Sequence, residues 1–219
     1  MEIARTSKGI FLYYRKYTTD LLKEVGMLVA KPCSTPMEYS GKLINSQSGI
    51  PLQDASSYQR LMGKLLYLTY TRPNLCFSFG HLRKFLSQPT NQHLSATMAV
   101  LRYLKSSITY GVFFSAKSKL NIKDYVDVGW ATYIDTRKFV SSYCFFLGDS
   151  LGSWKSKKQQ IVSRSSVEVE YRVMALAACE AQWQVSLLQE LGISHSHIVQ
   201  LFCDNQSTMH VVVNPVFQE

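Results

Sequence analysis

The sequence predicts an α/β protein in which a mixed β-sheet flanked by helices follows a mostly helical segment. Short runs of strand-forming residues alternate with turn residues from about Tyr110 to Lys155, and one long amphipathic pattern begins behind Ser165. The first half of the chain instead carries apolar residues at helical spacing. We therefore expect a helical region over residues 1–109 and a sheet-based domain over residues 110–219.

The first region is expected to open with a β-hairpin, because residues 2–13 alternate around Lys8-Gly9. A helix should follow and stop at Gly26, and residues 31–52, which contain three prolines, should form a long loop. Apolar stripes then predict three helices, over residues 58–69, 75–86 and 94–104.

The sequence pattern of the second region predicts strands on either side of one long helix. Ser165, with Glu168 three residues later, has the form of a capping box, and the apolar face behind it runs to Gly192. A strand over 198–203 and a helix over 206–213 should follow, which completes a β-β-β-α-β-α order. Four runs before the long helix are candidates for the three strands that open this order: residues 112–115, 120–128, 139–147 and 151–155.

Composition favours an anionic partner. The chain has 24 Lys and Arg against 15 Asp and Glu, a net charge of +9, and no long basic amphipathic helix that would favour a membrane surface. A basic balance is also common in stable proteins without such a partner. The five cysteines form no C-x-x-C pair, and neither a signal peptide nor a run of about 18 apolar residues is present. We expect reduced cysteines and an intracellular protein, cytoplasmic or nuclear and not secreted.

Three carboxylates are the candidate site. Asp127 ends a strand-like run, Glu170 lies in the first turn of the long helix, and Asp204 ends the apolar run before the last helix. Each position has a simpler interpretation: a turn former, a residue favoured by the helix dipole, and a helix N-cap. Their order along the chain would nevertheless let the fold bring them together, as two-metal phosphodiester hydrolysis requires.

The local sequences around these carboxylates resemble one family. Residues 125–131 are YVDVGWA, residues 154–160 are WKSKKQQ, residues 165–172 are SSVEVEYR and residues 202–206 are FCDNQ. Together they resemble the ribonuclease H (RNase H) domain of copia-type LTR-retrotransposon Pol polyproteins. Upstream, YQRLMGKLLYL at 58–68 and TRPN at 71–74 resemble the end of reverse transcriptase and its helical connection to RNase H.

The resemblance implies an RNase H-like fold over residues 110–219 and metal-dependent hydrolysis of RNA in RNA/DNA hybrids. It makes Asp127, Glu170 and Asp204 both catalytic residues and metal ligands, with two Mg²⁺ ions expected and Mn²⁺ possible as a substitute. Hybrid or other nucleic acid would be the partner. Basic residues just ahead of Glu170 would contact phosphates, unless they form only a solvated loop: Lys155, Lys157, Lys158 and Arg164.

The chain also departs from the family pattern. It begins beyond the part of reverse transcriptase that carries the catalytic aspartates, and it stops at Glu219, before the segment that supplies the fourth acidic residue. Gly129 stands where the family often has a second Asp, and Gln218 where it often has His. We therefore expect a truncated domain with impaired hydrolysis. The alternative is a catalytically silent retrotransposon remnant that at most binds nucleic acid.

Overall fold

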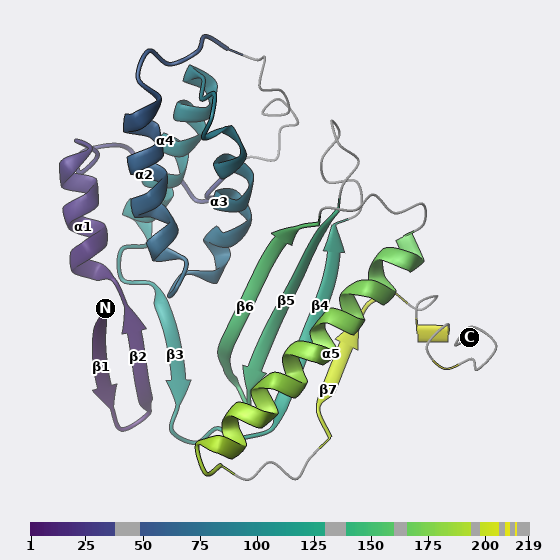
Figure 1. The fold of residues 1–219 in the computed structure, drawn as a ribbon. Coiled ribbons are helices and arrows are strands. Elements are labelled where there is room, and N and C mark those ends of the chain that lie inside the picture. Colours follow the sequence, from purple (N-terminus) through teal and green to yellow (C-terminus); the bar gives the residue numbers. More distant parts are fainter. Residues whose placement is uncertain are drawn as a thin grey trace. The chain divides into compact units, whose positions relative to one another are not determined.

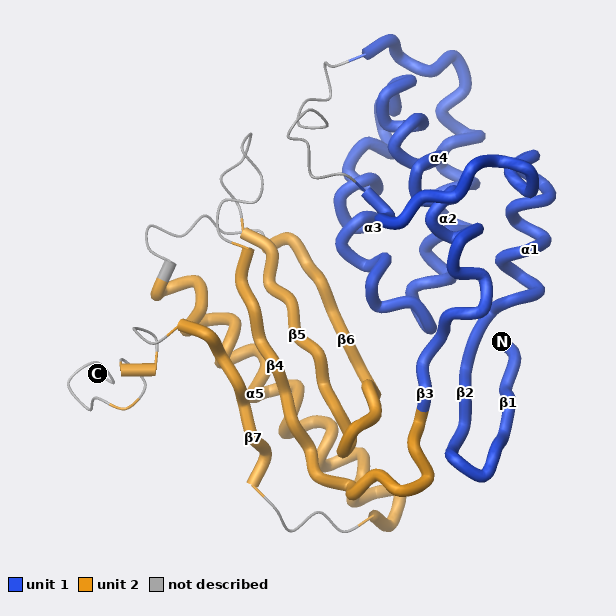
Figure 2. The backbone as a smooth tube through the Cα atoms, turned by 180° about the vertical axis from the view of Figure 1, so that it is seen from behind, with its two compact units in different colours: residues 1–113 blue, residues 114–219 orange. Residues whose placement is uncertain are grey.

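The structure is a computed structural model. It describes residues 1–37, 49–129, 139–159, 166–193, 198–205, 209–210 and 213, with only the backbone of Ser166. The chain divides into two compact units, Met1–Phe113 and Phe114–Glu219, which are coloured separately in Figure 2. We describe each unit by itself.

Unit 1 combines a small sheet with a group of helices. β1 and β2 form the predicted hairpin, and β3 adds to it to give a sheet with the order β1-β2-β3. β3 begins in unit 1 and ends in unit 2. The elements in chain order are β1 (Glu2–Thr6), β2 (Gly9–Tyr13), α1 (Arg15–Glu24), α2 (Ala55–Leu68), the 3-10 helix η1 (Pro73–Leu75), α3 (Cys76–Leu82), the 3-10 helix η2 (Arg83–Phe85), α4 (Asn91–Ser106) and β3 (Gly111–Ser115).

The helices of unit 1 share one apolar core. Leu22 of α1, Leu65 of α2 and Leu101 of α4 are fully buried within it. Asp54 begins α2 by accepting hydrogen bonds from the backbone N–H groups of Ser56 and Ser57, at 2.9 and 3.2 Å. Such a cap satisfies donors that have no partner inside the helix.

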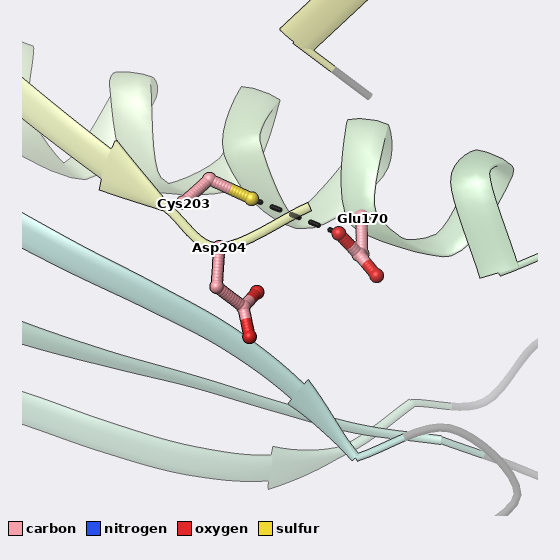
Figure 3. A group of neighbouring side chains, drawn as sticks. All are labelled: Glu170, Cys203 and Asp204. Carbon is pink, nitrogen blue, oxygen red and sulfur yellow. Dashed lines mark hydrogen bonds between the residues drawn. The ribbon is translucent and has the colours of Figure 1, made fainter. Parts of the chain in front are cut away.

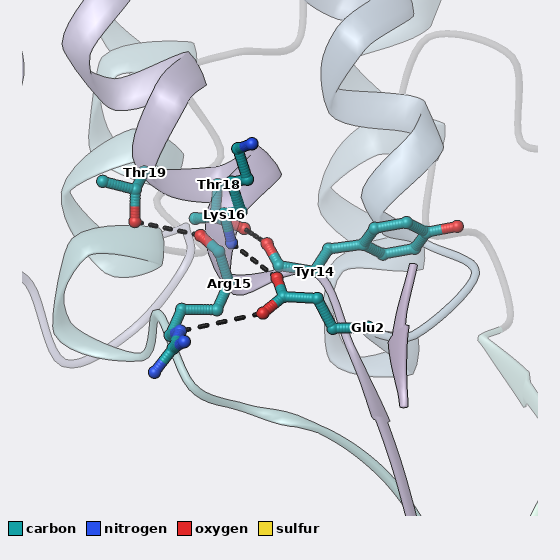
Figure 4. A network of polar contacts seen from close by, with 6 residues as sticks. All are labelled: Glu2, Tyr14, Arg15, Lys16, Thr18 and Thr19. Atoms are coloured by element: carbon teal, nitrogen blue, oxygen red, sulfur yellow. Dashed lines mark hydrogen bonds and ion pairs between the residues drawn. The ribbon is translucent and has the colours of Figure 1, made fainter. Parts of the chain in front are cut away.

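α1 receives its cap from another element. Tyr14 at its N-cap position makes no side-chain cap bond. Instead, Oε1 of Glu2 on β1 accepts from the backbone N–H of Lys16 at 2.7 Å, and Oε2 lies 3.8 Å from Nε of Arg15 (Figure 4). A carboxylate at this end also interacts favourably with the helix dipole.

Unit 2 is a mixed four-stranded sheet with one long helix. The sheet order is β6-β5-β4-β7, in which β4 pairs antiparallel with β5 and parallel with β7, and β5 pairs antiparallel with β6. α5 lies across one face of this sheet (Figure 1). The elements are β4 (Ile122–Gly129), β5 (Val140–Leu147), β6 (Ser150–Lys158), α5 (Ser166–Glu190) and β7 (Gln200–Cys203).

Alternation along the strands decides which residues face α5. Val126 of β4 packs with Val169 and Val173 of α5, and Cys203 of β7 joins the same cluster. Because successive side chains in a strand point to opposite faces, the neighbours of these strand residues, Tyr125 among them, lie on the face away from α5. Phe202 stacks on Tyr125 there, with 4.9 Å between ring centroids.

The α/β class with a mixed sheet is confirmed, but two predicted elements differ. The helix expected over residues 75–86 is divided into η1, α3 and η2, with Pro73 starting the first 3-10 turn. The strand expected over 112–115 pairs with β2 rather than with the sheet of unit 2. The capping residue Ser165 lies outside the described residues, as does most of the helix expected over 206–213. Within the described ranges, no helix is both long and apolar enough to cross a membrane.

Candidate functional site

Two of the three sequence-predicted carboxylates meet in the structure. Glu170 comes from the first turns of α5, and Asp204 follows directly after β7 (Figure 3). Together with Cys203 they place three potential ligand atoms within 4.8 Å of one another. Glu170 and Cys203 are half-buried and Asp204 is exposed, so the group opens to solvent.

Hydrogen bonds orient the Glu170 carboxylate. Nδ2 of Asn205 donates to Oε1 of Glu170 at 2.7 Å, and the Cys203 thiol donates to Oε2 at 3.7 Å. Burial raises the pKa of the Cys203 thiol, and the carboxylates of Glu170 and Asp204 add to the rise. The thiol is therefore protonated near neutral pH and can act as this donor.

Packing beneath the group explains why it forms. Val169, which precedes Glu170, is fully buried against the cluster that contains Cys203 and Val126. Val126 and Cys203 are also register partners of the parallel β4–β7 pair. These apolar contacts fix the start of α5 over the end of β7. Because Glu170 follows Val169 and Asp204 follows Cys203, the two carboxylates are brought together.

Asp127 stands on the adjacent strand but outside the close group. It is the residue after Val126, just as Asp204 is the residue after Cys203, so each aspartate follows one of two register partners of the parallel β4–β7 pair. Its side chain is exposed on the face away from α5, and its carbonyl accepts from Oγ of Ser142 at 3.2 Å. Asp127 is not among the residues whose ligand atoms lie within 4.8 Å.

The donor set suits one magnesium ion. Glu170 and Asp204 offer hard carboxylate oxygens, and the exposure of Asp204 leaves room for the waters that Mg²⁺ retains. A second ion needs further oxygen ligands, and Asp127 is the remaining candidate among the three predicted carboxylates. The sulfur of Cys203 is a soft ligand that does not suit magnesium.

The predicted phosphate-binding residues do not share one face. Lys155, Lys157 and Lys158 all lie on β6. Nζ of Lys155 lies 5.9 Å from the ring centroid of Tyr143, which packs toward α5. Lys157 therefore shares the α5 side, and Lys158 lies on the other. Arg164 is outside the described residues.

Charge is divided unequally between the units. Residues 1–113 contain 14 Lys and Arg against five Asp and Glu, whereas residues 114–219 contain ten of each. Unit 1 therefore carries the whole net charge of +9, and the unit with the carboxylates is neutral overall. The phosphate contacts predicted beside Glu170 therefore lie in the unit without net charge.

Sequence reasoning also missed several polar residues. Cys203 and Asn205 flank Asp204, and their place at the end of an apolar strand was the available signal. Asp124 is fully buried on β4, facing Glu180 of α5 and Tyr143 of β5. Burial raises the pKa of Asp124 to about 7, and the charge of Glu180 adds to the rise.

Known proteins resemble this chain over nearly its whole length. The retrovirus-related Pol polyprotein from transposon RE2 of Arabidopsis thaliana is 41% identical over 217 residues, and that from transposon RE1 is 39% identical over 217. Each match covers 99% of this chain. The chain belongs to the family of copia-type retrotransposon Pol polyproteins. The resemblance inferred from the motifs is thereby confirmed.

The copia-type chain spans about 15% of the length of these two Pol polyproteins. It also matches an uncharacterized mitochondrial protein of Arabidopsis thaliana at 38% identity, over 84% of this chain and 75% of that protein. No family model matches the sequence. No solved structure matches it either.

Proposed function

We propose that the chain contains a retroelement-derived RNase H-like domain that hydrolyses RNA in RNA/DNA hybrids with Mg²⁺, or with Mn²⁺ in its place. The observation that carries the proposal is the approach of Glu170 and Asp204 from separate elements to within 4.8 Å. The element order β4-β5-β6-α5-β7 supports it, because it matches the β-β-β-α-β order of an RNase H fold. The family membership supports it as well.

The residues have distinct proposed roles. Glu170 and Asp204 hold a cation between them, and Asn205 keeps the Glu170 carboxylate turned toward it. Asp127, two residues before the end of the neighbouring strand β4, completes the shell on the exposed side. When bound, the metal activates water and stabilises charge that develops on the phosphate. Lys155, Lys157, Lys158 and Arg164 position the hybrid through its phosphates.

A second candidate is nucleic-acid binding with little or no cleavage. The net charge of +9 in unit 1 favours it, since phosphate neutralisation needs only cations. Asp127 stands outside the close group and Gly129 offers no carboxylate, so the metal shell is sparse. We accordingly propose slow hydrolysis rather than efficient turnover.

A cleavage assay on an end-labelled RNA/DNA hybrid tests the proposal. Hydrolysis of the RNA strand should appear with Mg²⁺ and disappear with EDTA. Asp204→Asn and Glu170→Gln should each lower the rate more than about 100-fold, because loss of a residue that only supports a ligand already costs 10–100-fold. Asp149→Asn, in the exposed turn between β5 and β6, is the matched control and should leave the rate unchanged.

Two results decide between the candidates. Cleavage that persists in Asp204→Asn and Glu170→Gln would reject the assignment of the site. Binding of the hybrid without any Mg²⁺-dependent cleavage would establish the binding function alone.

A further inference from the structure

We propose that Glu170, Cys203 and Asp204 also form a site for a thiophilic divalent cation of the Zn²⁺ class, selected by the Cys203 sulfur. The inference concerns the same group of side chains as the proposed function. Cation binding itself does not depend on that function. Only the consequence, inhibition of hydrolysis, rests on it.

The ligand geometry supports a sulfur-containing site. The three ligand atoms lie within 4.8 Å of one another, and the Cys203 sulfur is 3.7 Å from Oε2 of Glu170. Zinc binds sulfur at about 2.3 Å and carboxylate oxygen at about 2.0–2.2 Å. Ligands around one zinc ion therefore lie no more than about 4.5 Å apart, and small side-chain rotations would bring this group into that range.

The remaining surroundings suit an open zinc site. Asn205 already engages Oε1 of Glu170, which leaves Oε2 on the side of the sulfur. Asp204 is exposed, so a fourth position remains accessible to water. Three protein ligands with one open position is the arrangement of many non-structural zinc sites. Among the described residues, no other group of three His, Cys, Asp or Glu side chains comes this close together.

The chemistry of the donors determines the selectivity. Magnesium prefers oxygen and gains nothing from a thiol, whereas zinc and cobalt bind a thiolate strongly. Binding converts the Cys203 thiol to a thiolate and releases its proton to the solvent. A zinc ion held in this way would occupy the oxygens of Glu170 and Asp204 that Mg²⁺ needs. Zinc should therefore compete with magnesium and inhibit hydrolysis.

Cobalt titration of the full chain measures the site directly. Co²⁺ bound to a thiolate gives a sulfur-to-metal charge-transfer absorption that oxygen ligands do not give. We expect this absorption at one equivalent, its loss when Zn²⁺ is added, and its persistence in excess Mg²⁺. Cys203→Ser should abolish it, and Cys179→Ser, at an exposed cysteine on α5, should leave it intact.

A second variant keeps the thiol in place. Glu170→Gln should retain Cys203 but weaken Co²⁺ binding at least about tenfold, because one ligand is lost. An absorption that survives Cys203→Ser, that disappears in Cys179→Ser, or that is missing from the wild-type chain would overturn the proposal. So would Glu170→Gln binding Co²⁺ as tightly as the wild-type chain does.

The readout separates this inference from the proposed function. A chain that shows Cys203-dependent cobalt absorption but no cleavage with Mg²⁺ would retain the thiophilic site and lose the nuclease. A chain that cleaves with Mg²⁺ but gives no cobalt absorption would retain the nuclease and lose the thiophilic site.

Discussion

Asp124 is the residue whose environment conflicts most with its chemistry. Its side chain is fully buried on β4, and within the described structure neither carboxylate oxygen has a partner of good hydrogen-bond geometry. Burial raises the pKa of Asp124, and this effect outweighs the backbone N–H of Tyr125, which lowers it. Two ionisable groups interact electrostatically with Asp124: Glu180 of α5 and Tyr143 of β5. Gln184 of α5 is a further buried polar side chain. An ionised carboxylate here would be costly, so the native state favours the protonated form.

The stability of unit 2 should therefore fall as pH rises. The pKa of Asp124 is about 7 in the folded chain and about 3.9 when unfolded. The stabilising effect of the bound proton is fully present below the unfolded value and is lost as pH rises through about 7. Asp124→Asn should raise the free energy of unfolding at pH 8 by roughly 2–4 kcal/mol and change it little at pH 4.

Denaturant unfolding followed by circular dichroism across this pH range measures the effect. Asp149→Asn removes an exposed carboxyl from the turn between β5 and β6 and should leave the pH dependence in place. A gain at pH 4 as large as that at pH 8 would show that the benefit of Asp124→Asn comes from something other than ionisation.

At the scale of the element, the N-terminus of α1 is capped by a residue 14 positions before the amide that it binds. Glu2 of β1 supplies the only side-chain cap described for its first turn, at 2.7 Å from the Lys16 nitrogen. Glu2→Ala should lower the free energy of unfolding of unit 1 by about 1 kcal/mol, the usual cost of losing a cap. Glu2→Gln keeps an oxygen acceptor and should lose less.

Hydrogen exchange of the first-turn amides of α1 checks this assignment. Faster exchange at Lys16 in Glu2→Ala, with the α4 amides unchanged, is the expected result. Equal acceleration throughout the unit would mean that Glu2 acts on the sheet rather than on the helix.

The elements also show what periodicity could and could not predict. Alternation predicted the hairpin and the strands of unit 2, and the 3.6-residue period predicted α2, α4 and α5, because each pattern is local. Pairing is not local: residues 112–115 have a strand pattern whether they join β2 or β4, and only the tertiary structure shows that β3 joins β2.

The residues of the candidate site also differ in whether a local sequence pattern could predict them. Glu170 and Asp204 could be predicted as partners, because each sits at an element boundary in a characteristic order. The burial of Asp124 opposite Glu180 could not be predicted from the sequence, because it depends on which face of β4 lies under α5. The convergence of Asp127 with the other two carboxylates stays a prediction.

At the scale of the whole molecule, the uneven division of charge predicts which unit controls affinity. Unit 1 carries the entire net charge, whereas the basic residues of unit 2 are matched by equal numbers of acidic ones. Sequence-independent affinity for a polyanion follows from the number of phosphates neutralised. Unit 1 should therefore determine affinity, and Lys155, Lys157 and Lys158 should determine placement beside the carboxylates.

Two triple variants that remove the same charge separate these roles. Lys23→Gln, Arg60→Gln and Arg83→Gln neutralise three exposed cations of unit 1. Lys155→Gln, Lys157→Gln and Lys158→Gln neutralise three cations of unit 2, of which Lys158 is half-buried. We expect the unit 1 triple to weaken binding of a hybrid in EDTA. It should also flatten the plot of log K against log salt by up to about three, since each lost phosphate contact removes about 0.9 from the slope.

The unit 2 triple should leave that slope nearly unchanged. It should instead slow cleavage at saturating hybrid, because the phosphates of the bound hybrid are no longer positioned beside Glu170 and Asp204. Fluorescence anisotropy from 50 to 200 mM salt gives the slope, and single-turnover cleavage gives the rate. A larger loss of slope in the unit 2 triple would show that the electrostatic interface lies on β6, where local charges outweigh the neutral balance of their unit.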